Sequence, residues 1–323
     1  MMKGLNKIIL VLCFICISLS FVLYKVSVGS SSIWCPQKYI FISPDLNCAE
    51  DPSKQTQNLK ESANTIINKR ILDNEADRVS VFYRNLSNRQ WFGINENENF
   101  SPGSLLKLPL AMAYYKMAEI QPNILNQQFK YEPDKKAKNL YDVQSVKPDK
   151  KLEPGAVYSI HELIKYMIQY SDNEAVPLLS SSIDGEFFEK IYVDLGVYFP
   201  KTGGIEQDFV SVKTYGAILR SLYNASYLNQ TFSNELLEVM SQSSFKSGIV
   251  AGVPNTVRVS NKFGERIVTS SLSKDVTYSE LHDCGIVYDH SSPYVLCVMT
   301  RGEDFAELLK VVSDISKIVY ESR

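Results

Sequence analysis

The amino-acid sequence predicts an α+β fold: an antiparallel sheet flanked by terminal helices, with an inserted all-helical lobe. Alternation of apolar and polar residues predicts strands near residue 80 and again beyond residue 255. Between them, from about 104 to 245, apolar residues mostly recur at helical spacing. Helical patterns also come before the first strand, at 57–72, and after the last strand, at 305–320. We therefore expect two lobes with a cleft where they meet.

Turn chemistry and capping support individual elements. The strand patterns at 79–84 and 90–94 are separated by the turn residues Ser87 and Asn88, which predicts a hairpin. Ser159 and Glu162 match a capping box at the start of a helix. Further helices are expected at 184–195, 209–226 and 233–244, and further strands at 256–266, 283–288 and 293–300.

The composition is that of a packed globular protein, because 45% of the 323 residues are hydrophobic, 22% are charged and the formal net charge is −2. No predicted helix carries a stripe of Lys and Arg, so we expect no nucleic-acid partner. No group of His, Cys and carboxylate residues has the spacing of zinc ligands, so we expect neither a metal nor another cofactor.

The N-terminus predicts export of the remaining chain. Residues 8–24 form an uncharged apolar run with Lys3 and Lys7 before it and Lys25 after it. A run of this length almost spans a bilayer, and lysines on its N-terminal side favour a cytoplasmic N-terminus. We interpret the segment as the anchor of a single-pass protein of the cell membrane. A cleaved signal peptide, and hence a secreted protein, is the alternative.

This interpretation divides the chain into four parts. They are a cytoplasmic tail at 1–7, the anchor or signal peptide at 8–28, an extracytoplasmic spacer at 29–55, and a folded domain at 56–323. Within the domain we expect an α/β lobe made of 56–103 and 246–323, and a helical lobe at 104–245.

Cysteine usage agrees with export, since an even number of cysteines follows the apolar run: Cys35, Cys48, Cys284 and Cys297. The strand patterns around a polar turn at 289–292 place the last two opposite each other. This register permits a cross-strand disulfide, and two buried free thiols fit it equally well. The pairing of all four cysteines is left open by the sequence.

Ser104 and Lys107 stand one helical turn apart, just after Pro102 and Gly103. Residues at i and i+3 lie on one face of a helix, so the hydroxyl and the amine can meet. Serine is a weak nucleophile that needs a neighbouring base, and a lysine with a pKa lowered by burial can accept its proton. The pair alone is a weak signal, because any capped helix followed by lysine produces it.

Two further motifs strengthen that signal. Ser171-Asp172-Asn173 directly follows the capped helix and places two short polar side chains on one side of a tight turn. Lys262-Phe263-Gly264-Glu265 lies on a predicted strand, where lysine can neutralise an anion and glycine lets a flat substrate approach the backbone.

With these motifs in this order, the sequence resembles the penicillin-recognising serine hydrolases, which include the D,D-peptidases, and most of all the catalytic domain of class A β-lactamases. The signatures of that family are Ser-x-x-Lys, Ser-Asp-Asn and Lys-Thr-Gly. The resemblance covers about residues 56–323.

The resemblance implies a role for each matched residue. The implied catalytic residues are Ser104 as nucleophile, Lys107 as base for acylation, Ser171 as carrier of a proton to the leaving nitrogen, and Lys262 as a source of positive charge. The implied substrate-binding residues are Asn173, Phe263, Gly264 and Glu265. Backbone N–H groups of Ser104 and Glu265 would form the oxyanion hole.

One departure from the family concerns the loop before Asp208. Class A enzymes carry there a glutamate that activates water for deacylation, and here the loop, 197–207, is about ten residues shorter than the resemblance implies. Glu206 is the remaining candidate for this base, and a solvated loop charge is its alternative interpretation. We therefore expect slow deacylation.

A second departure concerns the substrate carboxylate. Phe263 replaces the hydroxyl residue of the third motif, and Cys284 stands where many class A enzymes have an arginine. Arg266 or His282 would substitute for it. The histidine is also explained as a strand residue bound to Asp283 or to the backbone.

The sequence leaves more than one function open. A β-lactamase-like hydrolase would form an acyl-enzyme through Ser104 with β-lactams or related cell-wall peptides. A membrane-anchored D,D-carboxypeptidase-like enzyme would act on peptidoglycan stem peptides, and the short loop and the predicted anchor favour it. A non-catalytic sensor would bind the same ligands without turnover, but the intact motifs argue against it.

Overall fold

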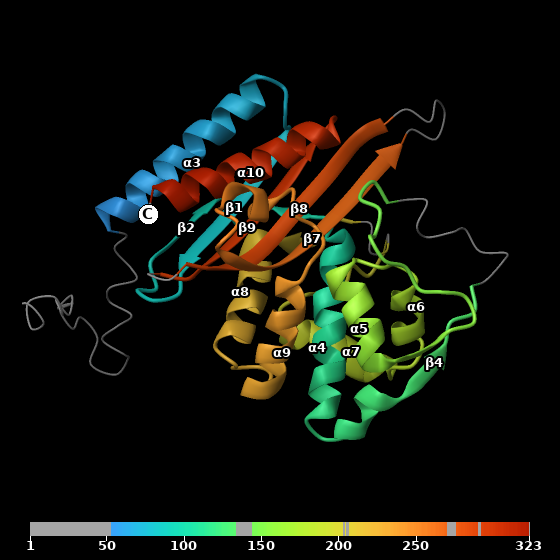
Figure 1. The fold of residues 1–323 in the computed structure, drawn as a ribbon. Coiled ribbons are helices and arrows are strands. Elements are labelled where there is room, and N and C mark those ends of the chain that lie inside the picture. Colours follow the sequence, from blue (N-terminus) through green and yellow to red (C-terminus); the bar gives the residue numbers. More distant parts are fainter. Residues whose placement is uncertain are drawn as a thin grey trace, which may run out of the picture. The chain divides into compact units, whose positions relative to one another are not determined.

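Five antiparallel strands form one sheet in the order β2-β1-β9-β8-β7 (Figure 1). Their bounds are β1 Arg78–Asn85, β2 Trp91–Ile94, β7 Arg258–Thr269, β8 Val276–Tyr288 and β9 Tyr294–Gly302. The predicted hairpin is confirmed, with Val81 opposite Ile94. Because β1 also pairs with β9, strands from both ends of the domain join in one sheet, as the sequence predicted.

The computed structural model describes residues 53–133, 144–202, 204, 207–269, 276–289 and 292–322. The predicted membrane anchor, most of the predicted spacer, Cys35, Cys48 and Glu206 lie outside these residues. Of the helices within the described ranges, none is both long and apolar enough to cross a bilayer.

The terminal helices α3 (Lys54–Leu72) and α10 (Phe305–Glu321) cover one face of the sheet (Figure 1). Buried side chains such as Leu59 and Val312 form a hydrophobic cluster there with the strands. Helix α3 begins earlier than the sequence pattern predicted. The reason is Ser53, whose side chain accepts a hydrogen bond of 3.2 Å from the Thr56 N–H and caps the helix.

The inserted helical lobe covers the other face of the sheet (Figure 1). Its helices are α4 Lys107–Ala118, α5 Ile160–Gln169, α6 Ala175–Ser180, α7 Gly185–Asp194, α8 Val212–Tyr223 and α9 Gln230–Ser241. Shorter elements are the 3₁₀ turns η2 Gly103–Leu106, η3 Pro122–Asn126 and η5 Ile249–Gly252, and the strand pairs β3 Asn99–Phe100 with β6 Val210–Ser211 and β4 Gln128–Lys130 with β5 Val157–Ser159. The capping box of Ser159 and Glu162 is present at the start of α5.

The starts of α9 and β8 also differ from those predicted. Helix α9 begins at Gln230 because Asn229 caps it, accepting a hydrogen bond of 3.0 Å from the Phe232 N–H. Strand β8 begins at Val276, earlier than predicted, because polar residues in its first half hide the strand pattern. Glu280 is fully buried there and is bonded to Arg301 on β9 over 2.9 Å, so a pair of charges occupies a place where the sequence pattern requires apolar residues.

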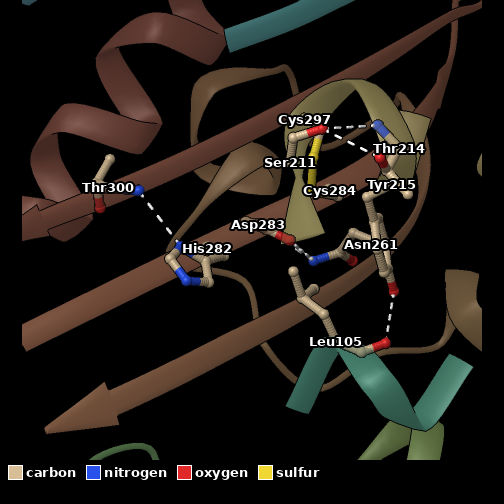
Figure 2. The surroundings of a disulfide bond; sticks show 10 residues. All are labelled: Leu105, Ser211, Thr214, Tyr215, Asn261, His282, Asp283, Cys284, Cys297 and Thr300. Carbon is tan, nitrogen blue, oxygen red and sulfur yellow. Dashed lines mark hydrogen bonds between the residues drawn. A yellow bond between two sulfur atoms is a disulfide. The ribbon is translucent and has the colours of Figure 1, made fainter. Parts of the chain in front are cut away.

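The cross-strand disulfide is present, and it links Cys284 on β8 to Cys297 on β9 (Figure 2). The two residues are register partners, and both are fully buried beneath the helical lobe. Of the two interpretations that the sequence left open for this pair, the structure therefore has the disulfide.

Candidate active site

Ser104 lies in the 3₁₀ turn η2, which runs directly into α4 at Lys107. Two tyrosines of the helical lobe hold this turn. The Tyr215 hydroxyl donates to the Leu105 carbonyl over 3.1 Å (Figure 2), and the Tyr192 hydroxyl donates to the Leu106 carbonyl over 2.8 Å. Burial raises the pKa of both phenols, so they remain protonated donors. The turn that bears Ser104 is thus held at its C-terminal end.

Glycines let strand β7 pack against the same turn. A Cβ added to Gly264 would lie 2.7 Å from the Pro102 carbonyl oxygen, and one added to Gly103 would lie 2.7 Å from the Glu265 carbonyl oxygen. Gly103 also has a φ of +49°, in the left-handed region that favours glycine. The sequence predicted that Gly264 lets a substrate approach the backbone; in the structure the turn that bears Ser104 occupies the space beside it.

The amine of Lys107 is buried and points to the Ser171 turn. Nζ donates to the Ser171 carbonyl oxygen and to Asn173 Oδ1, each over 2.6 Å, and lies 3.3 Å from Ser171 Oγ. The side chain is only 5% exposed. The first two sequence motifs therefore meet, as their proposed roles require.

Lys262 reaches the same hydroxyl from the sheet. Its Nζ donates to Ser171 Oγ over 2.9 Å and to its neighbour's carbonyl oxygen, Phe263 O, over 2.7 Å. The side chain is completely buried. Amines from the helical lobe and from β7 therefore converge on one serine hydroxyl.

The backbone of the Ser171 turn ends α5 and starts α6. Ser171 has a φ of +55°, in the left-handed region, which stops the helix. Asp172 follows and is fully buried; its carboxylate accepts hydrogen bonds from Ala175 N over 3.0 Å and from Leu152 N over 3.4 Å. These bonds fix the turn that presents Ser171 and Asn173.

The two lysines have lowered pKa values, mainly because burial disfavours their charged forms. The pKa of Lys107 lies well below its ordinary value, owing to burial and then to the positive charge of Lys262. Burial lowers the pKa of Lys262 to about 7. A neutral Lys107 beside a charged Lys262 is the arrangement that suits a base next to an anion-binding group.

Phe263 does not line the site with its side chain. The ring is 3% exposed, stacks on Phe245 with 4.2 Å between centroids, and belongs to the core beneath the terminal helices. Consecutive residues of a strand point to opposite faces, so Lys262 and Phe263 diverge. The predicted substrate contact of Phe263 is thus limited to its backbone.

His282 is fully buried and bound to the backbone. Ring nitrogen Nε2 lies 2.9 Å from the Ser101 carbonyl oxygen, and the Thr300 N–H donates to Nδ1 over 3.4 Å (Figure 2). Burial lowers its pKa to about 4, so the ring is neutral near pH 7 and offers no charge to a substrate carboxylate. These contacts match the structural interpretation of the histidine. Asp283 instead binds Asn261, over 3.0 Å (Figure 2).

Arg266 lies on β7 two residues beyond Gly264, with Glu280 as its register partner on β8. It is partly exposed, and its charge acts on the buried Glu280 carboxylate. Glu280 and Asp208 both bind Arg301, so Arg266 stands at the end of a row of alternating charges. It remains a predicted carboxylate-binding residue.

The structure adds one residue that the sequence did not indicate, Gln144, and a contact of the Glu265 carboxylate that was not predicted. Gln144, which is 6% exposed, donates from Nε2 to the Ser171 carbonyl oxygen over 3.2 Å. The Glu265 carboxylate accepts hydrogen bonds from Ser145 N over 3.1 Å and Val146 N over 3.2 Å. No sequence signal marks Gln144, because its partner lies far along the chain. In the described part of the chain, no cluster of His, Cys, Asp and Glu could hold a metal ion.

Comparison with known proteins places the chain in a family. The family model described as the beta-lactamase enzyme family matches residues 59–322. None of the curated protein sequences matches the chain.

Solved structures share the fold. A mutant of PBP-A, determined as an acyl-enzyme complex with penicillin G, is 17% identical with a TM-score of 0.66, over 84% of this chain and 98% of that one. The TLA-1 extended-spectrum β-lactamase is 17% identical with a TM-score of 0.67, over 83% and 99%. A class A β-lactamase from Bacteroides cellulosilyticus DSM 14838 is 17% identical with a TM-score of 0.67, over 83% and 98%. With the family model spanning most of its length, the chain belongs to the β-lactamase enzyme family.

Proposed function

We propose that this chain is a serine hydrolase of the β-lactamase kind that forms an acyl-enzyme through Ser104 with β-lactams or related cell-wall peptides, and that it deacylates slowly. The observation that carries the proposal is the convergence of Lys107 and Lys262 on Ser171, beside the turn that bears Ser104. Membership of the family supports the reaction class.

Acylation uses the two lysines in different protonation states. A neutral amine has two N–H groups and one lone pair. In Lys107 the Ser171 carbonyl and Asn173 Oδ1 accept the two N–H groups, which leaves the lone pair to take the proton of Ser104. Ser171 Oγ, held by Lys262, then delivers its proton to the leaving nitrogen and takes one from the protonated amine of Lys107, 3.3 Å away. The backbone N–H groups of Ser104 and Glu265 stabilise the oxyanion, each donor contributing about 3 kcal/mol.

Deacylation needs a base that activates water, and the acids around the turn are already engaged. The Asp172 carboxylate accepts the Ala175 N–H, and the Glu265 carboxylate binds backbone N–H groups. Glu206 stays the proposed base of the shortened loop. A weak or distant base leaves the acyl-enzyme long-lived.

The short loop also favours a second candidate, a D,D-carboxypeptidase-like enzyme anchored at the membrane and acting on peptidoglycan stem peptides outside the cell. The acylation chemistry is the same, and Ser104, Lys107 and Lys262 keep their roles. The two candidates differ in which acyl-enzyme is hydrolysed faster, the one formed from a β-lactam or the one formed from a stem peptide.

The test is a time course of intact mass with a chromogenic cephalosporin, a fluorescent penicillin and a peptide ending in D-Ala-D-Ala. We expect a covalent adduct that outlives mixing, with a burst of colour followed by slow turnover. Ser104→Ala removes the adduct, while Ser87→Ala at the exposed hairpin turn leaves it unchanged. Release of D-Ala at a higher rate than cephalosporin turnover identifies the peptidase, and binding without any adduct identifies a sensor and refutes the acyl-enzyme.

A further inference from the structure

The side chain of Glu265 connects the edge strand of the sheet to a segment that crosses beside the site. Strand β7 is the last strand in the order, so among the described residues its outer edge has no neighbouring strand. Residues 144–146, which we call the crossing segment, approach Glu265 there. The carboxylate accepts the N–H groups of both Ser145 and Val146, over 3.1 and 3.2 Å.

The first residue of the crossing segment reaches the helical lobe. Gln144 Nε2 donates to the Ser171 carbonyl oxygen over 3.2 Å, and that oxygen also accepts the Lys107 amine over 2.6 Å. If the Gln144 amide were turned round, its oxygen would face the Ser171 carbonyl oxygen, which is also an acceptor. The NH₂ group of Gln144 therefore faces that carbonyl. One carbonyl is therefore held between a glutamine and the predicted base.

The position of Gln144 is not explained by its own bonds. Its Oε1 is buried and has no hydrogen-bond partner among the described residues. A buried acceptor without a partner is unfavourable, so other contacts must keep the side chain in place. The two hydrogen bonds to Glu265, on the residues immediately following Gln144, are charge-assisted and belong to the stronger class.

We propose that the carboxylate of Glu265 is a positioning residue: it fastens the crossing segment to β7, and through Gln144 it holds the Ser171 turn and the Lys107 amine in their working geometry. The role of the turn in acylation rests on the proposed function. The role is separate from that of the Glu265 backbone N–H, which the oxyanion hole would use. Ser171 has a left-handed φ, and such a turn persists only when its surroundings hold it.

Hydrogen exchange measures this connection without any substrate. In Glu265→Ala of the full chain, the amides of Ser145 and Val146 exchange at least about tenfold faster, because a charge-assisted bond is lost. The amide of Asp172, bonded to Tyr166 O over 3.1 Å, also exchanges faster, since one of the contacts that hold the turn is lost. In Gln144→Leu only the amide of Asp172 changes, because Glu265 still holds its two donors. Glu265→Gln keeps an acceptor and restores most of the protection. Glu189→Gln on the exposed face of α7 is the matched control.

Acylation by a fluorescent penicillin is the second measurement. We expect the maximal acylation rate to fall at least about tenfold in both Glu265→Ala and Gln144→Leu, with recovery in Glu265→Gln and little change in non-covalent affinity. If the wild-type chain forms no adduct, the proposed function fails, and the exchange data alone decide the connection. Unchanged exchange at residues 145 and 146 in Glu265→Ala overturns the proposal. Faster exchange there without any effect on Asp172 overturns the link to the turn.

Discussion

The amine of Lys262 donates a hydrogen bond to the hydroxyl of Ser171 over 2.9 Å, and this bond joins the sheet to the helical lobe at the centre of the site. Lys107 approaches the same hydroxyl to 3.3 Å from the start of α4. Two lysine amines that are buried beside one hydroxyl cannot both be protonated without a large cost in free energy. Their protonation states are therefore coupled.

The acylation rate is expected to follow a bell-shaped dependence on pH. Lys107 must be neutral to act as base, and its pKa is lowered by burial and by Lys262, so activity falls as the pH drops through that value. Lys262 must be charged to attract an anionic substrate, and its pKa is about 7, so activity also falls above neutral pH. Pre-steady-state acylation measured across pH checks both limbs. A rate that keeps rising well above pH 8 would contradict the assignment of Lys262.

Substitutions of Lys262 should distinguish the effect of its positive charge on Lys107 from the effect of its own titration. In Lys262→Met the charge that lowers the pKa of Lys107 is gone, so the acidic limb moves to higher pH. In Lys262→Arg the charge remains and does not titrate, so the acidic limb stays and the alkaline limb is lost. The same acidic limb in Lys262→Met and wild type would show that the two lysines do not interact.

Gly264→Ala should displace the turn that bears Ser104. The new methyl group would lie 2.7 Å from the Pro102 carbonyl oxygen, which is backbone and cannot move alone. We expect a loss of about 1–3 kcal/mol in the free energy of unfolding and slower acylation of Ser104. Gly185→Ala is the control, because no atom lies within 4 Å of its added Cβ. Urea unfolding and acylation rates measure both effects, and a wild-type rate in Gly264→Ala would refute the close packing.

The disulfide should stabilise the domain by restricting the unfolded chain. Cys284 and Cys297 are 13 residues apart, and closing a loop of that size contributes about 3 kcal/mol. Replacing both by Ala should lower the free energy of unfolding by about 2–4 kcal/mol in urea, relative to the oxidised wild type. Equal stability of the two proteins would mean that the bridge contributes nothing to the free energy of unfolding.

Local signals explain why so much of the fold was predictable. The capping box at Ser159, the hairpin turn at Ser87 and Asn88, and the terminal helices each depend on neighbours in sequence. The three motifs were also recognisable, since each occupies a few consecutive residues. The convergence of Lys107 and Lys262 on Ser171 was inferred from family resemblance, and the structure places them together.

Long-range contacts explain what was missed. The first half of β8 looked polar because Glu280 is neutralised by Arg301 from another strand. Phe263 was read as a site residue, although strand alternation turns its ring to the opposite core. Gln144 has no local mark at all, because its position depends on the Glu265 carboxylate more than a hundred residues later.

Mapping the penicillin adduct to a residue tests the central claim most directly. After brief exposure to a fluorescent penicillin, the chain is digested and the labelled peptide is identified by mass spectrometry. The account predicts a single label on Ser104, its loss in Ser104→Ala, and a rate reduced about 10²-fold or more in Lys107→Ala. A label on another residue, or one that persists in Ser104→Ala, would contradict it.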